Sequence, residues 1–353
     1  MLGTGGRFAQ AQGPTGLAYS SIAPPPGSLA DENPRHPMSD TTRQRQIRDL
    51  LLRLAPTEGY TVSPIDSVRW LRSNRPLDST PVLYEPGIVF VCQGRKRGFI
   101  GDRTLVYDAR HYLVVAVPVP FTMETDASEA APLLAAYLRL DPALAAEVAL
   151  AIDQSGIDRE DTPPGPAAPL GLEASPMDDR IEGTLLRFLE AMADPMETAV
   201  LGPALLRELY FRVLCGAQGA TLRSVLGERG HLGRIALALK RIHADYAERL
   251  DVSRLAREAG LGLAAFHAHF KTVTQTTPMQ YLKSTRLHRA RLLMLHQGMT
   301  AAAAADRVGY ESASQFSREF RRLFGRAPQA EVARLKASFA IPEQVDEAFV
   351  SSH

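Results

Sequence analysis

Two stretches near the C-terminus carry side chains whose types and spacing suit hydrogen bonding to DNA. At about 100° per residue, a helix that follows Ser312 would turn outward Ser314, Ser317, Arg318 and Arg321. Arginine can donate two parallel hydrogen bonds to guanine, and serine or lysine can donate to phosphate oxygens. A helix that follows Gly262 would turn outward Ala264, His267, Ala268 and Lys271. These eight residues are the predicted DNA-binding residues of the chain.

The two stretches belong to one internal repeat. The pattern Phe266-Xaa3-Phe270-Xaa7-Pro278 recurs 50 residues later as Phe316-Xaa3-Phe320-Xaa7-Pro328. Each copy follows a short apolar run that ends in a glycine, Gly260 in the first copy and Gly309 in the second. A short helix, a left-handed glycine turn and a second helix form a helix-turn-helix unit. The repeat therefore predicts two such units, with Leu263, Phe266, Phe270 and Val273 on the buried face of the first.

The charge of the chain is divided unevenly. Residues 231–336 hold 18 Lys and Arg against 8 Asp and Glu, a net charge of +10. The whole chain carries only +1, so the remainder carries −9. A basic helical domain with two helix-turn-helix units is typical of DNA binding. The alternative is an all-α domain whose amphipathic helices only form a core.

The C-terminal repeat also carries a family resemblance. The run Gly309–Phe320, followed by Phe324-Gly325 and Pro328, resembles the C-terminal signature of AraC-type transcriptional regulators. The runs Phe266–Lys271 and Thr277–Leu282 resemble the first unit of the same family. The resemblance implies a sequence-specific transcription regulator that binds double-stranded DNA. It further implies a small organic effector, a homodimer and RNA polymerase as a further partner.

The segment from Tyr60 to Leu140 predicts a β-sandwich or barrel. Short runs rich in β-branched and aromatic residues alternate with turn signals such as Pro86-Gly87 and Gly101-Asp102. The predicted strands cover residues 68–71, 82–84, 87–92, 97–100, 104–107, 112–117 and 133–140. Arg95-Lys96-Arg97 is expected to form a solvated hairpin tip.

This segment resembles the N-terminal domain of a subgroup of AraC-type regulators. The resemblance rests on Tyr84-Glu85-Pro86, Gln93–Arg97, Gly101-Asp102, Tyr107-Asp108 and His111–Val115. It implies an α+β fold: an N-terminal cupin-like β-barrel with helices, then an all-α double helix-turn-helix domain. It also implies effector sensing or dimerisation by the barrel. Because effector pockets are mostly apolar, the predicted effector-binding residues are Trp70, Tyr84, Phe90, Tyr107 and Tyr112.

Composition divides the chain into six parts. Residues 1–37 read as a disordered extension, with Met38 as the expected natural start. Residues 38–155 form the effector or dimerisation domain, 156–176 a linker, 177–230 a helical connector or dimerisation region, 231–336 the DNA-binding domain and 337–353 a tail. Helices are expected at 43–54, 141–152, 178–192, 203–215, 234–246 and 280–296. The helices at 178–192 and 203–215 suit either dimerisation or packing against the barrel.

Enzymatic and metal sites are not expected. Residues 60–152 contain one histidine, His111, and so lack the His-Xaa-His pair of metal-binding cupins. The chain shows no P-loop, nucleophile elbow or dinucleotide-binding motif, so no cofactor is predicted. Cys92 and Cys215 are expected to be buried free thiols of a cytoplasmic protein. No apolar run approaches the roughly 20 residues that span a bilayer, so no membrane partner is expected.

Two alternatives to the regulator remain open. One is a dimerisation or ligand-binding protein without specific DNA recognition, and the other, weaker, is a cupin enzyme. The first helix-turn-helix unit departs from the family pattern at Gly262, Leu263 and Ala268. Its helix therefore has a weaker N-cap and no arginine for guanine. Base discrimination is accordingly predicted to lie mainly in the second unit, and Arg286, inside the apolar arc of the helix at 280–296, is expected to pair with a carboxylate.

Overall fold

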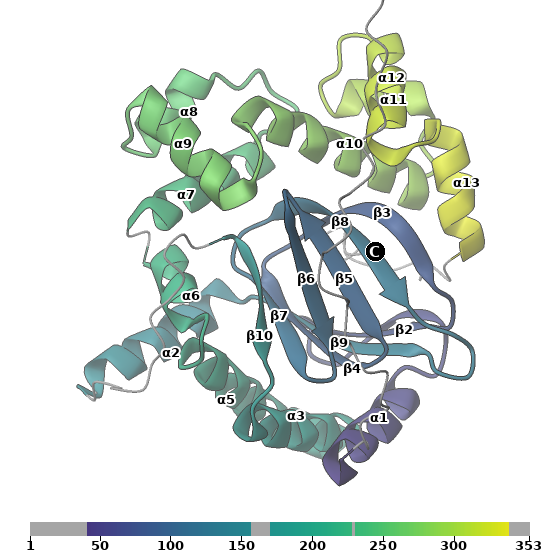
Figure 1. Ribbon diagram of the computed structural model, residues 1–353, viewed down its shortest axis with the longest axis vertical. Coiled ribbons are helices and arrows are strands. Elements are labelled where there is room, and N and C mark those ends of the chain that lie inside the picture. The colour runs from purple at the N-terminus through teal and green to yellow at the C-terminus, as the bar shows by residue number, and fades with distance from the viewer. Residues whose placement is uncertain (1–40, 157–169, 228–229, 339–353) are drawn as a thin grey trace, which may run out of the picture. The chain divides into compact units, whose positions relative to one another are not determined.

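The computed structural model describes residues 41–156, 170–227 and 230–338 (Figure 1). The predicted extension at 1–37, its expected start at Met38, most of the predicted linker and the tail beyond residue 338 lie outside these ranges. The strands are β1 (Gly59–Val62), β2 (Val68–Ser73), β3 (Leu77–Tyr84), β4 (Gly87–Gln93), β5 (Arg95–Ile100), β6 (Arg103–Asp108), β7 (His111–Val115), β8 (Val119–Asp126), β9 (Leu133–Arg139) and β10 (Leu172–Pro176).

Helices precede and follow the strands in the described chain. They are α1 (Thr42–Leu54), α2 (Pro142–Gln154), α3 (Asp179–Met192), α4 (Pro195–Val200), α5 (Gly202–Leu214), α6 (Gly219–Leu226), α7 (Gly230–Ala244), α8 (Val252–Glu258), α9 (Leu263–Thr274), α10 (Pro278–His296), α11 (Ala301–Arg307), α12 (Ala313–Phe324) and α13 (Pro328–Ser338). The predicted α+β class is confirmed. No helix in the described ranges is both long and apolar enough to span a bilayer.

The strands form one antiparallel sheet in the order β1-β2-β9-β4-β7-β6-β5-β8-β3, with β10 paired to β7. The β6–β7 contact is a single pair, Asp108 with His111, because β10 pairs with the remaining length of that edge of β7. Every predicted strand is present, but β1, β8 and β10 were not predicted. Strand β10 lies inside the predicted linker, and its pairing with β7 is a long-range contact that local composition does not reveal.

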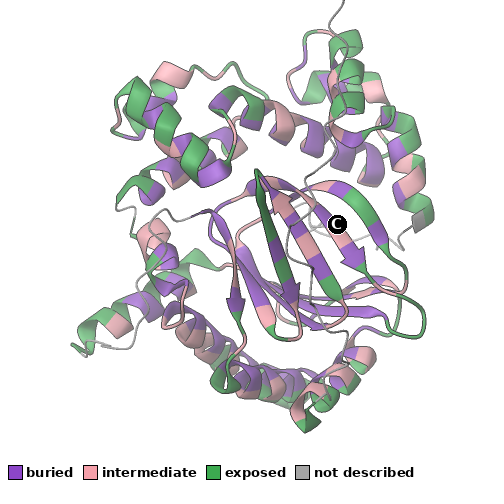
Figure 2. Ribbon diagram, viewed as in Figure 1, coloured by how far each residue is buried: buried purple, intermediate pink, exposed green. Residues whose placement is uncertain are grey.

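The sheet buries both of its faces because successive side chains point to opposite sides. The inner face carries Val89, Val91 and Tyr107 and continues into the core around α7, α9 and α10. The outer face carries Ile88 and Phe90 and lies under the helical layer of α1, α2, α3, α5 and α6. Figure 2 shows buried residues along both the strands and this layer.

Helices α3 and α5 bury their apolar stripes in the helical layer on the outer face of the sheet. The predicted inward stripe of α3 is buried against the outer face of the sheet: Ile181, Leu185, Phe188, Leu189 and Met192. On α5, Leu206, Leu209, Tyr210 and Leu214 are buried in the same cluster. The apolar stripes of both helices are therefore buried in the cluster on the outer face of the sheet.

The C-terminal helices form two helix-turn-helix units around α10. Phe266 and Phe270 pack with the first unit, and Phe316, Phe320 and Phe324 with the second. The predicted left-handed turns are confirmed, with φ of +63° at Gly260 and +82° at Gly309. A Cβ atom at Gly309 would lie 2.1 Å from the carbonyl oxygen of Ala247, so only glycine fits there.

Helix α10 also contacts the sheet through buried polar groups. The Tyr281 hydroxyl donates to the carbonyl of Pro118 at 2.9 Å and lies 2.7 Å from Nε2 of His243. Because the tyrosine proton goes to the carbonyl, His243 must donate from Nε2. Burial, and then the charge of Arg289, lower the pKa of His243 to about 3. The imidazole therefore stays neutral in the folded chain at any ordinary pH.

Acid should destabilise the fold through His243. A histidine in the unfolded chain has a pKa of about 6.5, so it binds a proton as pH falls below this value while folded His243 does not. The free energy of unfolding should drop by about 2 kcal/mol from this residue between pH 7 and pH 5. Urea denaturation at both pH values should show a smaller drop in His243→Gln. The exposed control His267→Gln should keep the wild-type drop, and an unchanged drop in His243→Gln would refute the assignment.

Candidate nucleic-acid interface

Helix α12 presents the second set of predicted DNA-binding residues to solvent. The Ser312 side chain accepts a hydrogen bond from the backbone N–H of Gln315 at 3.2 Å and caps the helix N-terminus. Its buried side holds Phe316, Phe320 and Phe324. The opposite side exposes Ser314, Ser317, Arg318 and Arg321. The structure thus brings these four polar residues onto one exposed helical face.

The carboxylate on this helix does not neutralise that face. Glu319 lies 3.0 Å from Nζ of Lys283 and accepts a hydrogen bond from the Tyr310 hydroxyl at 2.8 Å. Partial burial raises its pKa, but hydrogen bonds from Lys283, Tyr310 and Gln315 outweigh burial and lower it overall. Glu319 is therefore an ionised link between α12 and α10. In the described part of the chain, Arg318 and Arg321 form no ion pair and remain available to an anionic partner.

Helix α9 presents a smaller and less polar face. Ala264, His267, Ala268 and Lys271 are exposed, as predicted. The N-cap residue Gly262 makes no side-chain hydrogen bond, whereas α12 has its serine cap. The prediction that Leu263 is buried was wrong, since this side chain is 48% exposed. Leu263 lies in the first turn, before the point at which the helix meets its core at Phe266.

His269 makes an interhelical contact on the edge of this face. Its ring stacks on that of His231 in α7, with ring centroids 3.7 Å apart. Partial desolvation, and then the neighbouring His231, lower the pKa of His269. His269 therefore supports the packing of α9 on α7, and His267 is the histidine that faces outward.

Arg286 differs from its predicted role. Its guanidinium donates to three backbone carbonyls, those of Tyr246, Glu248 and Gly309, at 2.6, 2.8 and 3.0 Å. The expected carboxylate is replaced by carbonyl groups at the turns that precede α8 and α12. Because those turns belong to different units, Arg286 ties both units to α10. With 19 residues, α10 is about 28 Å long at 1.5 Å per residue.

The predicted effector-binding residues do not lie together. Tyr84 and Tyr107 lie on the inner face of the sheet, with their hydroxyl oxygens 3.4 Å apart. Trp70, Phe90 and Tyr112 lie on the outer face, where Trp70 packs against Phe188 of α3 at a centroid distance of 6.2 Å. Side-chain alternation along β2, β4 and β7 separates the two groups. Of the five predicted residues, only Tyr84 and Tyr107 can line one shared site on the inner face of the sheet.

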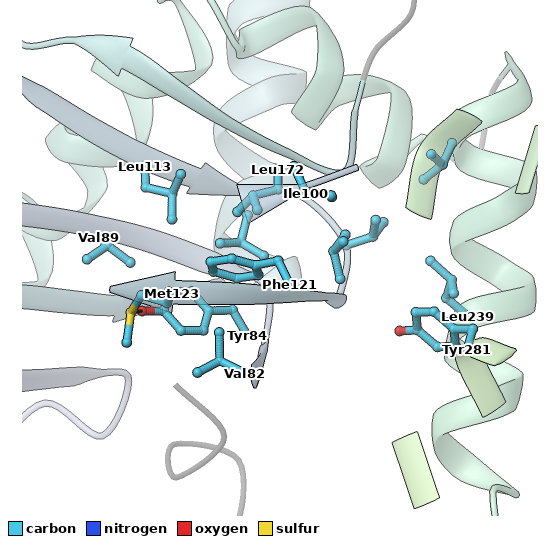
Figure 3. Packing of buried hydrophobic residues seen from close by; sticks show 14 of the residues in the cluster. Val82, Tyr84, Val89, Ile100, Leu113, Phe121, Met123, Leu172, Leu239 and Tyr281 are labelled. Carbon is cyan, nitrogen blue, oxygen red and sulfur yellow. Dashed lines mark hydrogen bonds between the residues drawn. The ribbon is translucent and has the colours of Figure 1, made fainter. Parts of the chain in front are cut away.

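The burial of Lys96 was not predicted from the sequence. The predicted solvated hairpin tip is instead part of β5, and Lys96 is only 2% exposed. Its Nζ donates to the Tyr84 hydroxyl at 3.2 Å (Figure 3 shows Tyr84 among its apolar neighbours). One signal was available in the sequence, because Lys96 is the only lysine among the first 239 residues.

The remaining candidate groups have structural roles. His111 lies 3.0 Å from Asp108 at the β6–β7 turn. Neither cysteine forms a disulfide, and Cys92 is buried whereas Cys215 is only half-buried, so the expected burial of Cys215 is incomplete. Burial, and then the charge of Glu182, raise the pKa of the Cys92 thiol, which keeps it in the unreactive protonated form.

Two family models match the chain. Residues 64–221 match the AraC-type transcriptional regulator N-terminus, and residues 255–334 match a helix-turn-helix domain. The virulence regulon transcriptional activator VirF of Yersinia enterocolitica is 30% identical over 182 residues, which are 51% of this chain and 65% of VirF. The HTH-type transcriptional regulator ExsA of Pseudomonas aeruginosa is 30% identical over 125 residues, 35% of this chain and 44% of ExsA. The chain thus spans less than two thirds of each relative.

A solved structure shares the fold over a longer range. An apo variant of ToxT from Vibrio cholerae superposes with a TM-score of 0.51 at 10% identity, covering 79% of this chain and all of ToxT. At this identity the similarity concerns the fold alone. Together with the two domain matches, it agrees with the order of sheet and helix-turn-helix units described above. By its AraC-type N-terminal domain and its helix-turn-helix domain, the chain belongs to the AraC-type family of transcriptional regulators.

Proposed function

We propose that the protein regulates transcription by binding specific DNA sequences in the cytoplasm, where it would assist or block RNA polymerase. The observation that carries this proposal is the exposed face of α12, a capped helix with two serines and two arginines that form no ion pair among the described residues. The net charge of +10 over residues 231–336 favours DNA further. Both recognition helices are free of the sheet on their outer sides, so DNA could reach them in this conformation.

We further propose that the two units bind successive major grooves on one side of the duplex. Arg286 and α10 hold the units in a defined arrangement, and major grooves on one side recur about every 10 base pairs. Footprinting on the DNA that flanks the protein's own gene should show two protected patches at this spacing. Inserting about five base pairs between them should abolish binding, because one patch then faces away. Unchanged affinity after the insertion would contradict a rigid pair of units.

The second unit should read bases, while the first contributes phosphate contacts and shape. Arg318→Ala should cost about 1–3 kcal/mol of binding free energy on the operator and relax the preference at one base pair. Lys271→Ala should weaken binding to every sequence and lower the slope of log affinity against log salt by about one unit. Both variants should be titrated on operator and scrambled DNA across a salt series. Equal losses on both DNAs for Arg318→Ala would mean that it only contacts phosphate.

The inner face of the sheet is the proposed effector site. Tyr84, Tyr107 and Lys96 supply polar groups in a mostly apolar interior, as ligand sites require. This interior belongs to the same buried cluster as Leu239 of α7 and Tyr281 of α10 (Figure 3). A ligand that repacks the inner face would therefore act on the helices that carry the recognition units. Trp70, Phe90 and Tyr112 are left out of this proposal because they belong to the filled outer layer.

A homodimer is proposed through α4. Met196 and Val200 on this helix are 74% and 69% exposed, and the adjoining Leu201 is 45% exposed. Large exposed apolar residues so close together suit a two-fold contact with a second copy. Sedimentation should show a dimer that Val200→Glu converts to monomer. Leu150→Glu on α2, where Leu150 is 56% exposed, is the matched control and should remain dimeric. A wild-type monomer at micromolar concentration would rule out the dimer.

A further inference from the structure

Lys96 lies inside the sheet between two outward-facing arginines. The Arg97 guanidinium pairs with Glu124 at 3.2 Å and Asp126 at 3.0 Å on the neighbouring strand. Lys96 points the opposite way, as strand alternation requires, and faces Tyr107 across the β5–β6 pair. Its burial is therefore imposed by the register of β5 and is not an accident of a long side chain folding back.

The surroundings of Lys96 leave its amine poorly solvated. An ammonium group has three donors, yet the only hydrogen-bond acceptor that the described residues provide is the Tyr84 hydroxyl at 3.2 Å. That hydroxyl in turn lies 2.9 Å from the Met123 sulfur and 3.4 Å from the Tyr107 hydroxyl. No carboxylate in the described ranges forms an ion pair with Lys96. Burial lowers the pKa of Lys96 to about 7, so about half of the amine is neutral at neutral pH.

The choice of lysine at this position is informative. The chain contains 35 arginines and only 5 lysines, and the other four lysines lie at residues 240, 271, 283 and 336. Ion pairs in the N-terminal half use arginine, for example Arg43 with Glu182 and Arg103 with Glu173. Arginine binds carboxylates better than lysine but does not deprotonate in proteins. Either residue type can bind an anion, as Lys283 does with Glu319, but of the two only lysine can supply a neutral nucleophilic amine.

We propose that the inner face of the sheet binds a small aldehyde or ketone and that Lys96 forms an imine with it. The lone pair of the neutral amine attacks the carbonyl carbon, and the carbonyl oxygen takes a proton from the Tyr84 hydroxyl. The nitrogen returns a proton to the Tyr84 oxygen, which leaves a carbinolamine. Loss of the hydroxyl group with one further proton releases water and forms the C=N bond. The reaction is a condensation with no change of oxidation state, so it needs no other reactant.

The hydroxyl groups of Tyr84 and Tyr107 are placed to pass this proton, since Tyr84 lies 3.2 Å from the Lys96 amine and 3.4 Å from Tyr107. Burial, and then the neighbouring Tyr107 and Tyr60, raise the pKa of Tyr84 well above its ordinary value. Tyr84 therefore remains protonated and can donate, and Tyr107 lies close enough to share the proton.

The adduct would lie on a strand that reaches the first helix-turn-helix unit. Strand β5 ends at Ile100, and the next residue, Gly101, lies against Gln275. A Cβ atom at Gly101 would meet Oε1 of Gln275 at 3.0 Å, and Gln275 is the left-handed cap that ends α9. A new group on Lys96 that shifts β5 would therefore also shift Gln275, at the C-terminal end of the recognition helix α9. This inference rests on the proposed regulatory function and names the chemical class of its effector.

Reductive trapping on the full-length protein tests the proposal without using DNA. The protein is treated with propanal and sodium cyanoborohydride at pH 7, and peptides are mapped by mass spectrometry over time. Lys96 should gain a propyl group at least about ten-fold faster than the exposed lysines Lys240, Lys271 and Lys336, because an ordinary lysine is almost wholly protonated at this pH. Its trapping rate should be half-maximal near pH 7. A Lys96 that is modified no faster than the exposed lysines overturns the proposal.

Two variants distinguish imine formation at Lys96 from simple exposure of its amine. Tyr84→Phe should slow trapping at Lys96 by at least about ten-fold, as expected for loss of a proton donor, and leave the other lysines unchanged. Faster modification of Lys96 in this variant would mean that the native site only hides the amine, which contradicts the proposal. Lys96→Arg keeps a charged group but cannot form an imine. Thermal melting of each variant is measured to confirm folding.

DNA binding then tests the link to regulation. Propanal should shift the affinity of the wild-type protein for its operator by at least about three-fold, within the range of ordinary allosteric coupling, and should not affect Lys96→Arg. Specific DNA binding without trapping at Lys96 would leave the proposed function standing and reject this inference. Trapping without any change in affinity would reject the carbonyl compound as an effector.

Discussion

The burial of α10 on several sides is the constraint on which the C-terminal half depends. Twelve of its 19 residues are buried, too many for a helix that contacts a single neighbour. Tyr281 and Leu282 meet the first unit, Leu287 and Met294 the second, and Arg291 reaches the carbonyl of Pro81 in β3 at 3.2 Å. Helix α10 therefore cannot slide without breaking contacts on several sides. Both recognition helices are held by this one helix.

Polar groups on α10 add specificity to this packing. A buried polar group without a partner destabilises the fold, so each one restricts the geometry to arrangements that satisfy it. Arg286 needs three carbonyls from two different turns. Arg291 is only 2% exposed and pairs with the equally buried Glu331 of α13 at 3.6 Å. Any rotation of α10 would break several of these contacts together, which favours a small number of discrete arrangements.

The sheet is constrained in another way, because both of its faces are buried and each is filled differently. The outer face is filled by helices whose apolar stripes match it, and this explains why Trp70 and Phe90 are structural. The inner face combines apolar side chains with Tyr84, Tyr107 and a lysine that has one hydroxyl partner. These hydroxyl and amine groups therefore lie on the inner face, which continues toward α7 and α10. The same alternation that builds the core determines which residues can respond to a ligand.

Local patterns in the sequence determined much of this protein. The spacing of Phe266, Phe270, Phe316 and Phe320 identified the two units, and the glycine turns and exposed polar faces followed from helical geometry. Non-local contacts decided the rest. The pairing of β10 with β7, the partners of Arg286 and the burial of Lys96 each depend on residues far away in the chain. Strand register alone assigns a side chain to one face or the other, and register is set by pairing between distant segments.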